Sequence, residues 1–460
     1  MENLIVDVKL WGQFVGSLIW DNSTEMAVFE YDSQYRRNGL ELAPLTMPLT
    51  HGSRPFSFPA NRTDCFKGLP GLIADALPDK FGNQIITEWF TRQGLAIGEI
   101  TPLERLCYVG RRAMGALEFE PSKASALLDQ STEIYIDELT RLAEDIFTKR
   151  EAFQERMCRE DKTILDILRV GTSAGGAKPK AIIAYNEQTN EVRSGQVKAP
   201  DGFGYWLLKF DGVTYSEHGS VMENPKGIGN VEYAYYKMAQ DCGIEMSECR
   251  LLDEGDNHHF MTRRFDRTNH GEKIHMQTVA GLAHLDRDQR HSYEEIFAII
   301  RRMNLPMEAS IQLFRRMVFN VVARNHDDHT KNFSFLMDKQ GQWMFSPAYD
   351  LCYSYKPGGR WTGQHQLSLN GKQDDFTRQD LLTVGEKAGI RHCGEIIDEI
   401  TDVVAHWRHY AQESGVRESH IAEIERNLIL QPEGRSVARE LNSGGSSAPT
   451  LEQEEPEFIG

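Results

Sequence analysis

The stretch RNHDDHTKNFSF, residues 324–335, combines two histidines, two aspartates, a lysine and two asparagines in one short run. Side chains of these types at this spacing suit a metal centre or the catalytic loop of a phosphoryl-transfer enzyme. Taken alone, such a run is more often a solvated charged loop. The residues before and after it therefore decide which chemistry the sequence supports.

The spacing around this run is the one that phosphoryl transfer requires. Asp327 stands five residues before Asn332, and Asp350 follows a predicted β-hairpin. In such a site one aspartate orients the attacking hydroxyl and accepts its proton, while an asparagine and a second aspartate hold Mg²⁺. Lys331 is placed to neutralise charge on a γ-phosphate, and His329 to orient the loop or contact phosphate.

A zinc site is the alternative interpretation of the same residues. His326 and His329 stand at i and i+3, and Asp327 or Asp328 would add a carboxylate. However, no third histidine or cysteine is placed to complete the ligand set. The hard oxygen ligands Asn332 and Asp350 suit Mg²⁺ better than zinc.

A second motif, GTSAGGAKPKA at residues 171–181, lies between a predicted helix and a predicted strand. Small residues let backbone N–H groups approach an anion closely, and Lys178 and Lys180 add positive charge. The stretch is neither GxxxxGK[ST] nor GxGxxG, and a plain turn is the alternative interpretation. The sequence thus indicates a candidate phosphate loop.

Lys209 is the third unusual feature, because it stands in the apolar strand YWLLKFDG. Burying an unpaired ammonium is costly, so Lys209 should meet a carboxylate or a phosphate. Glu232, on the following helix, is the candidate carboxylate, and the alternative is an edge strand with Lys209 in water. Together the features follow the order found in kinases: phosphate loop, strand lysine, helix glutamate, catalytic loop, metal aspartate.

The elements that must position these residues predict an α+β chain of more than one domain. Strands are expected in residues 1–60 and 180–212, helices in 69–110 and 135–170, and mostly helix after about 290. In SIQLFRRMVFNVVAR the predicted apolar face consists of Ile311, Phe314, Val318, Val321 and Val322. The predicted domains are 1–125, 126–262, 263–440 and a disordered acidic tail, 441–460.

Composition limits the classes of partner and compartment. The net charge of −17 argues against broad, unassisted binding to nucleic acid or to an anionic membrane. Seven scattered cysteines without a CxxC pair favour reduced thiols in a cytosol. The N-terminal residues do not look like a signal peptide, and no apolar run is long enough to span a membrane. A cytoplasmic location is expected.

At this point the sequence resembles the HipA family, the toxin kinases of bacterial HipA–HipB toxin–antitoxin modules. The resemblance rests on FKGLPGLIADALPDKFGN, GTSAGGAKPKA, FDR at 265–267, NHDDHTKNFSF and SPAYDL. It implies a bilobal, protein-kinase-like fold with a small N-terminal β-containing subdomain and a mostly helical C-terminal lobe. It also implies ATP- and Mg²⁺-dependent phosphorylation of serine or threonine in a protein, with a translation component as one kind of target. The implied partner is a HipB-like helix-turn-helix antitoxin, through which the chain would meet DNA only indirectly.

Carried over position by position, the resemblance gives each matching residue a role. Asp327 resembles the catalytic base, Asn332 and Asp350 the Mg²⁺ ligands, and Lys209 the lysine that binds the ATP phosphates. The remaining nucleotide-contacting positions are His329 and Lys331 in the catalytic loop, Ala174, Gly175, Gly176, Ala177, Lys178 and Lys180 in the phosphate loop, Glu232 beside the strand lysine, and Arg263, Arg264 and Phe265 in the hinge beside adenine.

Ser173 falls where members of the family phosphorylate themselves, and a dianionic phosphate there would repel the nucleotide phosphates. The alternative for Ser173 is a turn hydroxyl that satisfies a backbone group. One departure concerns the hinge, where the family often has a glutamate and this chain has Arg263. Hinge contacts to adenine are largely made by backbone, so this change is expected to alter a local salt bridge and to preserve nucleotide binding.

Three other functions remain open from the sequence. The chain could act as a non-catalytic corepressor on a DNA-bound antitoxin, as a small-molecule kinase of the same superfamily, or as a metal-dependent hydrolase built on the His/Asp cluster.

Overall fold

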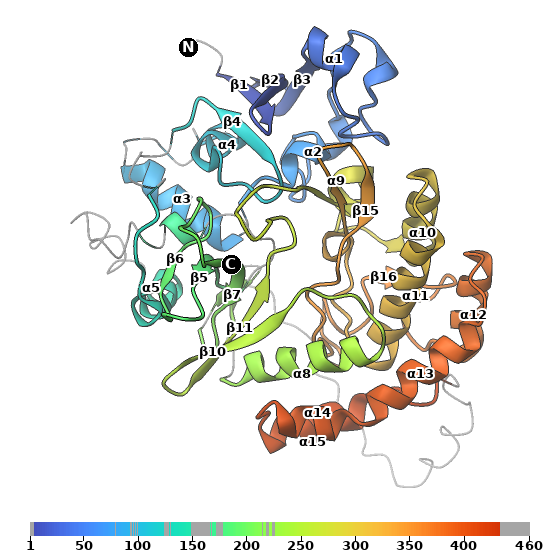
Figure 1. The fold of residues 1–460 in the computed structure, drawn as a ribbon. Helices are drawn as coiled ribbons and strands as arrows, with labels where there is room; N and C mark the ends of the chain where they lie inside the picture. The colour runs from blue at the N-terminus through green and yellow to red at the C-terminus, as the bar shows by residue number, and fades with distance from the viewer. Residues whose placement is uncertain are drawn as a thin grey trace, which may run out of the picture.

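The computed structural model describes residues 4–78, 80–92, 94, 96, 98, 100–123, 128, 130–148, 166, 168–171, 178–213, 215–217, 220–222 and 226–432. Figure 1 shows an N-terminal sheet at the top, a second sheet below it, and a mostly helical region at the right and bottom of the view. This mixture of separate sheets and helices confirms the predicted α+β class. The predicted tail, 441–460, lies outside the described residues, and the predicted domain boundaries stay predictions.

The N-terminal sheet forms because its strands alternate apolar and polar residues. Val6, Val8 and Leu10 of the first strand are buried, whereas Ile5 is exposed. All neighbouring strands run antiparallel in the order β3-β2-β1-β4. The strands are β1 (Ile5–Leu10), β2 (Gln13–Asp21), β3 (Met26–Tyr31) and β4 (Leu117–Glu120). Residues 4–31 and 117–120 therefore belong to one N-terminal unit.

Four helices complete the N-terminal unit. Pro78 lies between two of them, as expected for a residue that interrupts a helical pattern. Thr101 caps the last helix in a capping box with Glu104. The helices are α1 (Ser33–Asn38), α2 (Gly71–Ala74), α3 (Lys80–Arg92) and α4 (Pro102–Val109).

The second sheet has five antiparallel strands in the order β10-β11-β7-β5-β6. They are β5 (Lys180–Tyr185), β6 (Val192–Ser194), β7 (Gly204–Lys209), β10 (Cys249–Glu254) and β11 (Asn257–Arg263). Helix α8 (Ile228–Asp241) packs beside this sheet, and α5 (Ile136–Thr148) lies toward its opposite end (Figure 1). A short hairpin of β8 (Tyr215–Glu217) and β9 (Ser220–Met222) accompanies it. Strand β7 is thus an interior strand of the sheet.

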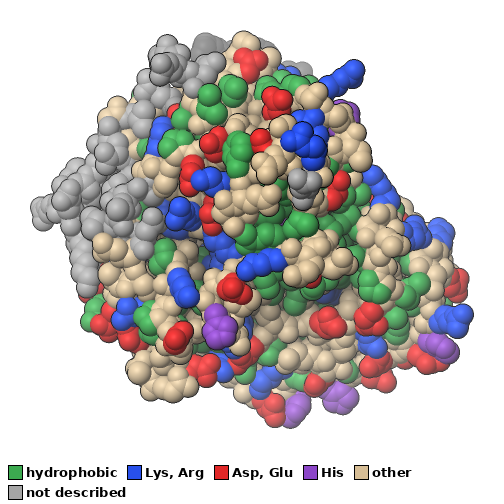
Figure 2. Space-filling model, turned by 45° about the horizontal axis from the view of Figure 1, so that its top comes forward, with side chains coloured by type: hydrophobic (Ala, Val, Ile, Leu, Met, Phe, Trp, Pro, Cys, Tyr) green, Lys and Arg blue, Asp and Glu red, His purple; other side chains and the backbone are tan. Residues whose placement is uncertain are grey.

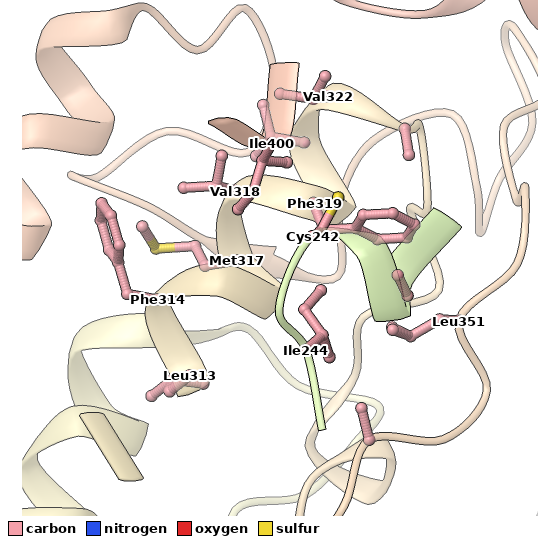
Figure 3. Close-up of a cluster of buried hydrophobic side chains, with 14 of the residues drawn as sticks. Cys242, Ile244, Leu313, Phe314, Met317, Val318, Phe319, Val322, Leu351 and Ile400 are labelled. Carbon is pink, nitrogen blue, oxygen red and sulfur yellow. The ribbon is translucent and has the colours of Figure 1, made fainter. Parts of the chain in front are cut away.

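The helical region is built around α11 (Met307–Val322), which is apolar on most of its surface. Figure 3 shows Phe314, Met317 and Val318 of this helix packed in a cluster with side chains from other segments. Of the predicted apolar face, Phe314, Val318, Val321 and Val322 are fully buried and Ile311 is partly buried. The other helices are α9 (Val279–Ala283), α10 (Tyr293–Arg302), α12 (Arg378–Lys387), α13 (Cys393–Ala405), α14 (Trp407–Glu413) and α15 (Glu418–Asn427).

The predicted hairpin before Asp350 is present. Strands β14 (Ser334–Met337) and β15 (Trp343–Phe345) pair antiparallel, and β12 (His275–Thr278) adds a third strand on the other side of β14. A two-stranded parallel pair, β13 (His291–Ser292) and β16 (Leu367–Ser368), lies nearby. Within the described part of the chain, no helix is long and apolar enough to cross a membrane. Six cysteines in that part have free thiols.

A fully buried charge cluster joins the N-terminal unit to the second sheet. The Asp266 carboxylate accepts two hydrogen bonds of 2.8 Å from Arg264, one of 2.8 Å from Arg267, and one of 2.7 Å from the backbone N–H of Gly115. Arg267 also donates to the carbonyls of Ala113 and Gly115. Burial would raise the pKa of Asp266, but the two guanidinium groups outweigh it and hold the pKa well below its usual range.

Replacing this carboxylate should weaken the fold in a pH-dependent way. Asp266→Asn leaves two buried guanidinium groups uncompensated, so we expect the free energy of unfolding at pH 7 to fall by about 3–5 kcal/mol. Because the folded pKa of Asp266 is depressed, its contribution is present above its ordinary pKa and is lost as the pH falls through the folded value. The difference in free energy of unfolding between wild type and Asp266→Asn should therefore become smaller below about pH 4, as measured by urea titrations.

The matched control is Asp201→Asn, at an exposed turn position, which should change the free energy of unfolding by less than about 0.5 kcal/mol. If the difference in free energy of unfolding between wild type and Asp266→Asn stayed constant down to pH 2, the ionised Asp266 carboxylate would not be the group that stabilises the fold.

Candidate active site

One cavity of about 810 Å³ collects most of the residues that the sequence singled out. It opens between the second sheet, the loop after α11 and the N-terminal unit. The predicted residues that line it are Lys180, Lys209, Glu232, Arg263, Arg264, Phe265, Asp327, His329, Lys331, Asn332 and Asp350. Lys178 is described but does not line the cavity, while Ser173, Ala174, Gly175, Gly176 and Ala177 lie outside the described residues.

The Lys209 ammonium lies at the end of β7 and pairs with two carboxylates. Its Nζ donates to Glu232 on α8, the predicted partner, and to Asp350 after the β14–β15 hairpin. Burial alone would lower the pKa of Lys209, but Asp350 and Glu232 together raise it above its ordinary value. The alternative of an edge-strand lysine in water is wrong, because β7 lies between β11 and β5 and the side chain is only 14% exposed.

Asp350 contributes a carboxylate that stays ionised. Burial would raise its pKa, but Lys209 and Lys180 outweigh that effect and hold the pKa well below its usual range. The backbone of Asp350 is left-handed, with φ of 57°. A residue other than glycine rarely adopts this conformation, and such local strain is concentrated at functional sites.

The catalytic-loop residues come together directly after α11. The Asp327 carboxylate is half exposed to the cavity, at 51%, and its Oδ1 lies 3.8 Å from Nε2 of His329. The Asn332 Nδ2 donates to the backbone carbonyl of Asp327 at 2.7 Å, so the loop closes on itself. Because the amide nitrogen of Asn332 already donates this hydrogen bond, its side-chain oxygen is the atom that can act as a ligand to a cation.

Asp328 has a different role from its neighbour. Its carboxylate is buried and accepts hydrogen bonds from Tyr293 at 2.7 Å, from His365 at 2.8 Å and from the backbone N–H of Gln366 at 2.8 Å. Asn320 of α11 donates in turn to the Tyr293 hydroxyl. Asp328 therefore fixes the loop to the helical region, which leaves Asp327 as the aspartate that faces the cavity.

The two histidines of the loop diverge. His326 is buried against His365, with ring centroids 4.0 Å apart, and burial, His365 and Arg324 lower its pKa to about 2. His329 faces Asp327, and burial lowers its pKa although Asp327 opposes the shift. The alternative zinc site on His326 and His329 finds no support, because no group of three or more His, Cys, Asp or Glu in the described residues is arranged to hold a metal.

Lys331 reaches from the loop to the N-terminal unit. Its Nζ donates to the backbone carbonyl of Cys65 at 3.4 Å. Nearby Asp75 is partly buried and accepts hydrogen bonds from the backbone N–H and hydroxyl of Thr278. Burial raises the pKa of Asp75, and the positive charge of Lys331 partly offsets the shift. The sequence assigned no role to these N-terminal residues, although they lie in or beside the motif FKGLPGLIADALPDKFGN.

The hinge residues line the cavity with their side chains already engaged. Arg263 pairs with Glu248 at 3.1 Å and donates to Asn269, so a salt bridge stands at the position where the family often has a glutamate. Arg264 is committed to Asp266, as described above. The Phe265 ring lies 5.6 Å from that of Tyr349, which the sequence analysis missed as a cavity residue.

The contrasting environments of the adjacent aspartates predict contrasting costs of substitution. Asp328→Asn disrupts a buried network of four hydrogen bonds and should lower the free energy of unfolding by about 2 kcal/mol or more. Asp327→Asn, at a half-exposed carboxylate, should change it by less than about 0.5 kcal/mol. Urea unfolding at pH 7 measures both, and equal losses would contradict the separation of roles.

Comparisons with known proteins agree with this architecture. Residues 6–120 match the family described as the HipA N-terminal domain, and residues 172–407 match the HipA-like C-terminal domain. The chain is 21% identical over 372 residues to the serine/threonine-protein kinase toxin HipA of Shewanella oneidensis, covering 76% of this chain and 75% of that protein. A Haemophilus influenzae relative is 26% identical over 196 residues, which span 39% of this chain and only 52% of the relative.

A solved structure shows the same fold. The HipA chain of the Shewanella oneidensis complex of HipA, HipB and operator DNA superposes with a TM-score of 0.61 at 18% identity, covering 92% of this chain and 95% of that chain. The family matches together reach over both the N-terminal unit and the region that bears the cavity. The chain therefore belongs to the HipA family.

Proposed function

We propose that the chain is an ATP- and Mg²⁺-dependent serine/threonine protein kinase that acts as the toxin of a HipA–HipB-type module. One observation carries this proposal. Lys209 forms ion pairs with Glu232 and Asp350 in the wall of the cavity, and Asp327 lines the same cavity. Kinase activity at the level of the family is supported by the name of the Shewanella relative.

The residues of this chain fit the tasks that phosphoryl transfer sets. Asp327 presents a carboxylate to the cavity, where it orients an acceptor hydroxyl and takes its proton. Lys209 stays positively charged and binds phosphate oxygens from the β7 side. Lys331 and His329 line the cavity next to Asp327, where Lys331 opposes negative charge that develops during transfer.

The donor set also fits a magnesium ion. The carboxylate of Asp350 and the side-chain oxygen of Asn332 line the same cavity and are the hard oxygen ligands that Mg²⁺ prefers. ATP supplies the phosphoryl group, and the metal neutralises its phosphates when both are bound. Lys178, Lys180 and the glycine-rich loop 174–177 would complete the phosphate site, and Ser173 would be the residue that the kinase phosphorylates in itself.

The partner that we propose is a HipB-like, DNA-binding antitoxin. The solved relative of the same fold is part of a complex with HipB and operator DNA. On the face that Figure 2 shows, Lys and Arg side chains lie among Asp and Glu side chains, and hydrophobic side chains gather in a hollow near the centre. Because the net charge of the chain is −17, we expect it to reach DNA through the antitoxin and not directly. A chain that binds a DNA-bound antitoxin can act as a corepressor and still be a kinase.

Removal of the proposed base tests the enzymatic function. Asp327→Ala should lower phosphoryl transfer from labelled Mg-ATP by at least about 100-fold and leave the unfolding midpoint near that of wild type. Glu308→Ala, at an exposed acid in the first turn of α11, is the matched control and should retain the wild-type rate. Transfer by Asp327→Ala at the wild-type rate would show that the base is assigned wrongly.

The acceptor is identified in the same assay. Purified protein is incubated with Mg-ATP and a cell lysate, and labelled products are mapped by phosphosite mass spectrometry. We expect phosphate on serine or threonine of a protein and on Ser173 of the chain itself. Label only in small metabolites would favour a small-molecule kinase and contradict the proposed substrate class.

The antitoxin is tested by co-elution. The full chain and the helix-turn-helix protein of the neighbouring gene should elute together in size-exclusion chromatography, and the complex should retard operator DNA in a gel. The chain alone should leave the DNA unshifted. Separate elution of the two proteins at micromolar concentration would contradict the proposed partner.

A further inference from the structure

Asp211 carries a buried carboxylate, lies two residues beyond Lys209 and has no role in the proposed chemistry. It is 1% exposed. Within the described residues its carboxylate accepts hydrogen bonds from backbone N–H groups, those of Gly227 at 2.9 Å, Ile228 at 3.1 Å, Gly229 at 3.5 Å and His258 at 3.3 Å. A buried carboxylate held by backbone N–H groups is an anchor between segments, because each bond fixes a main chain in place.

The main chain that Asp211 holds is the start of α8. The first N–H groups of a helix have no partner within the helix, and the helix dipole favours a negative charge at this end. The capping residue of α8 is Gly227, which has no side chain to supply an acceptor and adopts a left-handed backbone, with φ of 91°. Asp211 supplies the acceptor from the end of a neighbouring strand instead.

The start of α8 is also seated tightly on β11. A Cβ placed on Gly229 would lie 2.1 Å from the carbonyl oxygen of His258, so the helix and the strand touch backbone to backbone. The N–H of Asp211 donates to Nδ1 of His259 at 2.9 Å, and the Nε2 of that ring lies 2.8 Å from Glu254. These contacts hold Asp211 itself against β11.

Glu232, the partner of Lys209, lies one turn into the same helix. The ion pair between Lys209 and Glu232 connects the end of β7 to α8. The hydrogen bonds from the start of α8 to Asp211 connect the same two segments a second time. A shift or tilt of α8 relative to β7 changes both connections together. Catalytic geometry is sensitive to displacements of about 1 Å, so this second connection bears on the rate of transfer.

We infer that Asp211 is a positioning residue for phosphoryl transfer: it fixes α8 so that Glu232 holds Lys209 in place. The inference rests on the proposed kinase function. It assigns Asp211 no contact with substrate or nucleotide, since Asp211 does not line the cavity. If Asp211 serves only stability, its removal will affect the rate independently of Glu232.

A double-mutant cycle separates the two possibilities. Transfer rates at saturating Mg-ATP are measured for wild type, Asp211→Ala, Glu232→Gln and the double variant of the full chain, well below their unfolding midpoints. We expect Asp211→Ala to lower the rate by at least about tenfold in the wild-type background. In the Glu232→Gln background the same change should lower it by less than about twofold, because the interaction through which it acts is already lost.

The control is Thr377→Ala, which removes the capping box of α12 at a residue that does not line the cavity. It should lower the unfolding midpoint as a cap mutation does and change the rate by less than about twofold in both backgrounds. Should Asp211→Ala fail to fold, Asp211→Asn, which keeps the shape and one acceptor oxygen, takes its place in the cycle.

A rate for Asp211→Ala or Asp211→Asn equal to wild type, or equal fold-losses in both backgrounds, overturns the positioning role while the kinase function stands. A wild-type chain that transfers no phosphate overturns the proposed function and this inference with it. A loss confined to the wild-type background supports both.

Discussion

The site depends on one buried ammonium that pairs with two carboxylates. Lys209, Glu232 and Asp350 come from a strand, a helix and a post-hairpin segment, so their pairing fixes three elements that are far apart in the sequence. Buried charges are tolerated only when they are paired. Lys209 opposes both carboxylates, and Lys180 adds a second positive charge that acts on Asp350.

The surrounding fold keeps this pairing in register. Strand β7 is held on both sides, so Lys209 lies opposite Lys180 on β5 and Phe260 on β11. Helix α11 is buried on most of its surface and delivers the following loop from a rigid core (Figure 3). At the end of that loop, the buried Asp328 network determines which aspartate faces the cavity.

The sequence was sufficient to predict most of the residues that line the cavity, because unusual residues at fixed spacings are visible without a structure. A lysine in an apolar strand predicted the ion pair with Glu232, and the 3.6-residue period predicted α11. It singled out Asp327, but it could not show that the neighbouring Asp328 is buried, since that depends on Tyr293 and His365 from distant segments. Nor could it reveal Asp75 or Asp211, whose partners are backbone groups distant in sequence.

The hydrogen bond from Lys331 to the carbonyl of Cys65 links the catalytic loop to the main chain of the N-terminal unit. Its acceptor is main chain, so no side-chain substitution at position 65 removes it directly. The contact is lost when Lys331 is replaced or when the N-terminal segment moves away from the loop. The contact therefore couples the place of the Lys331 ammonium in the cavity wall to the position of the N-terminal main chain.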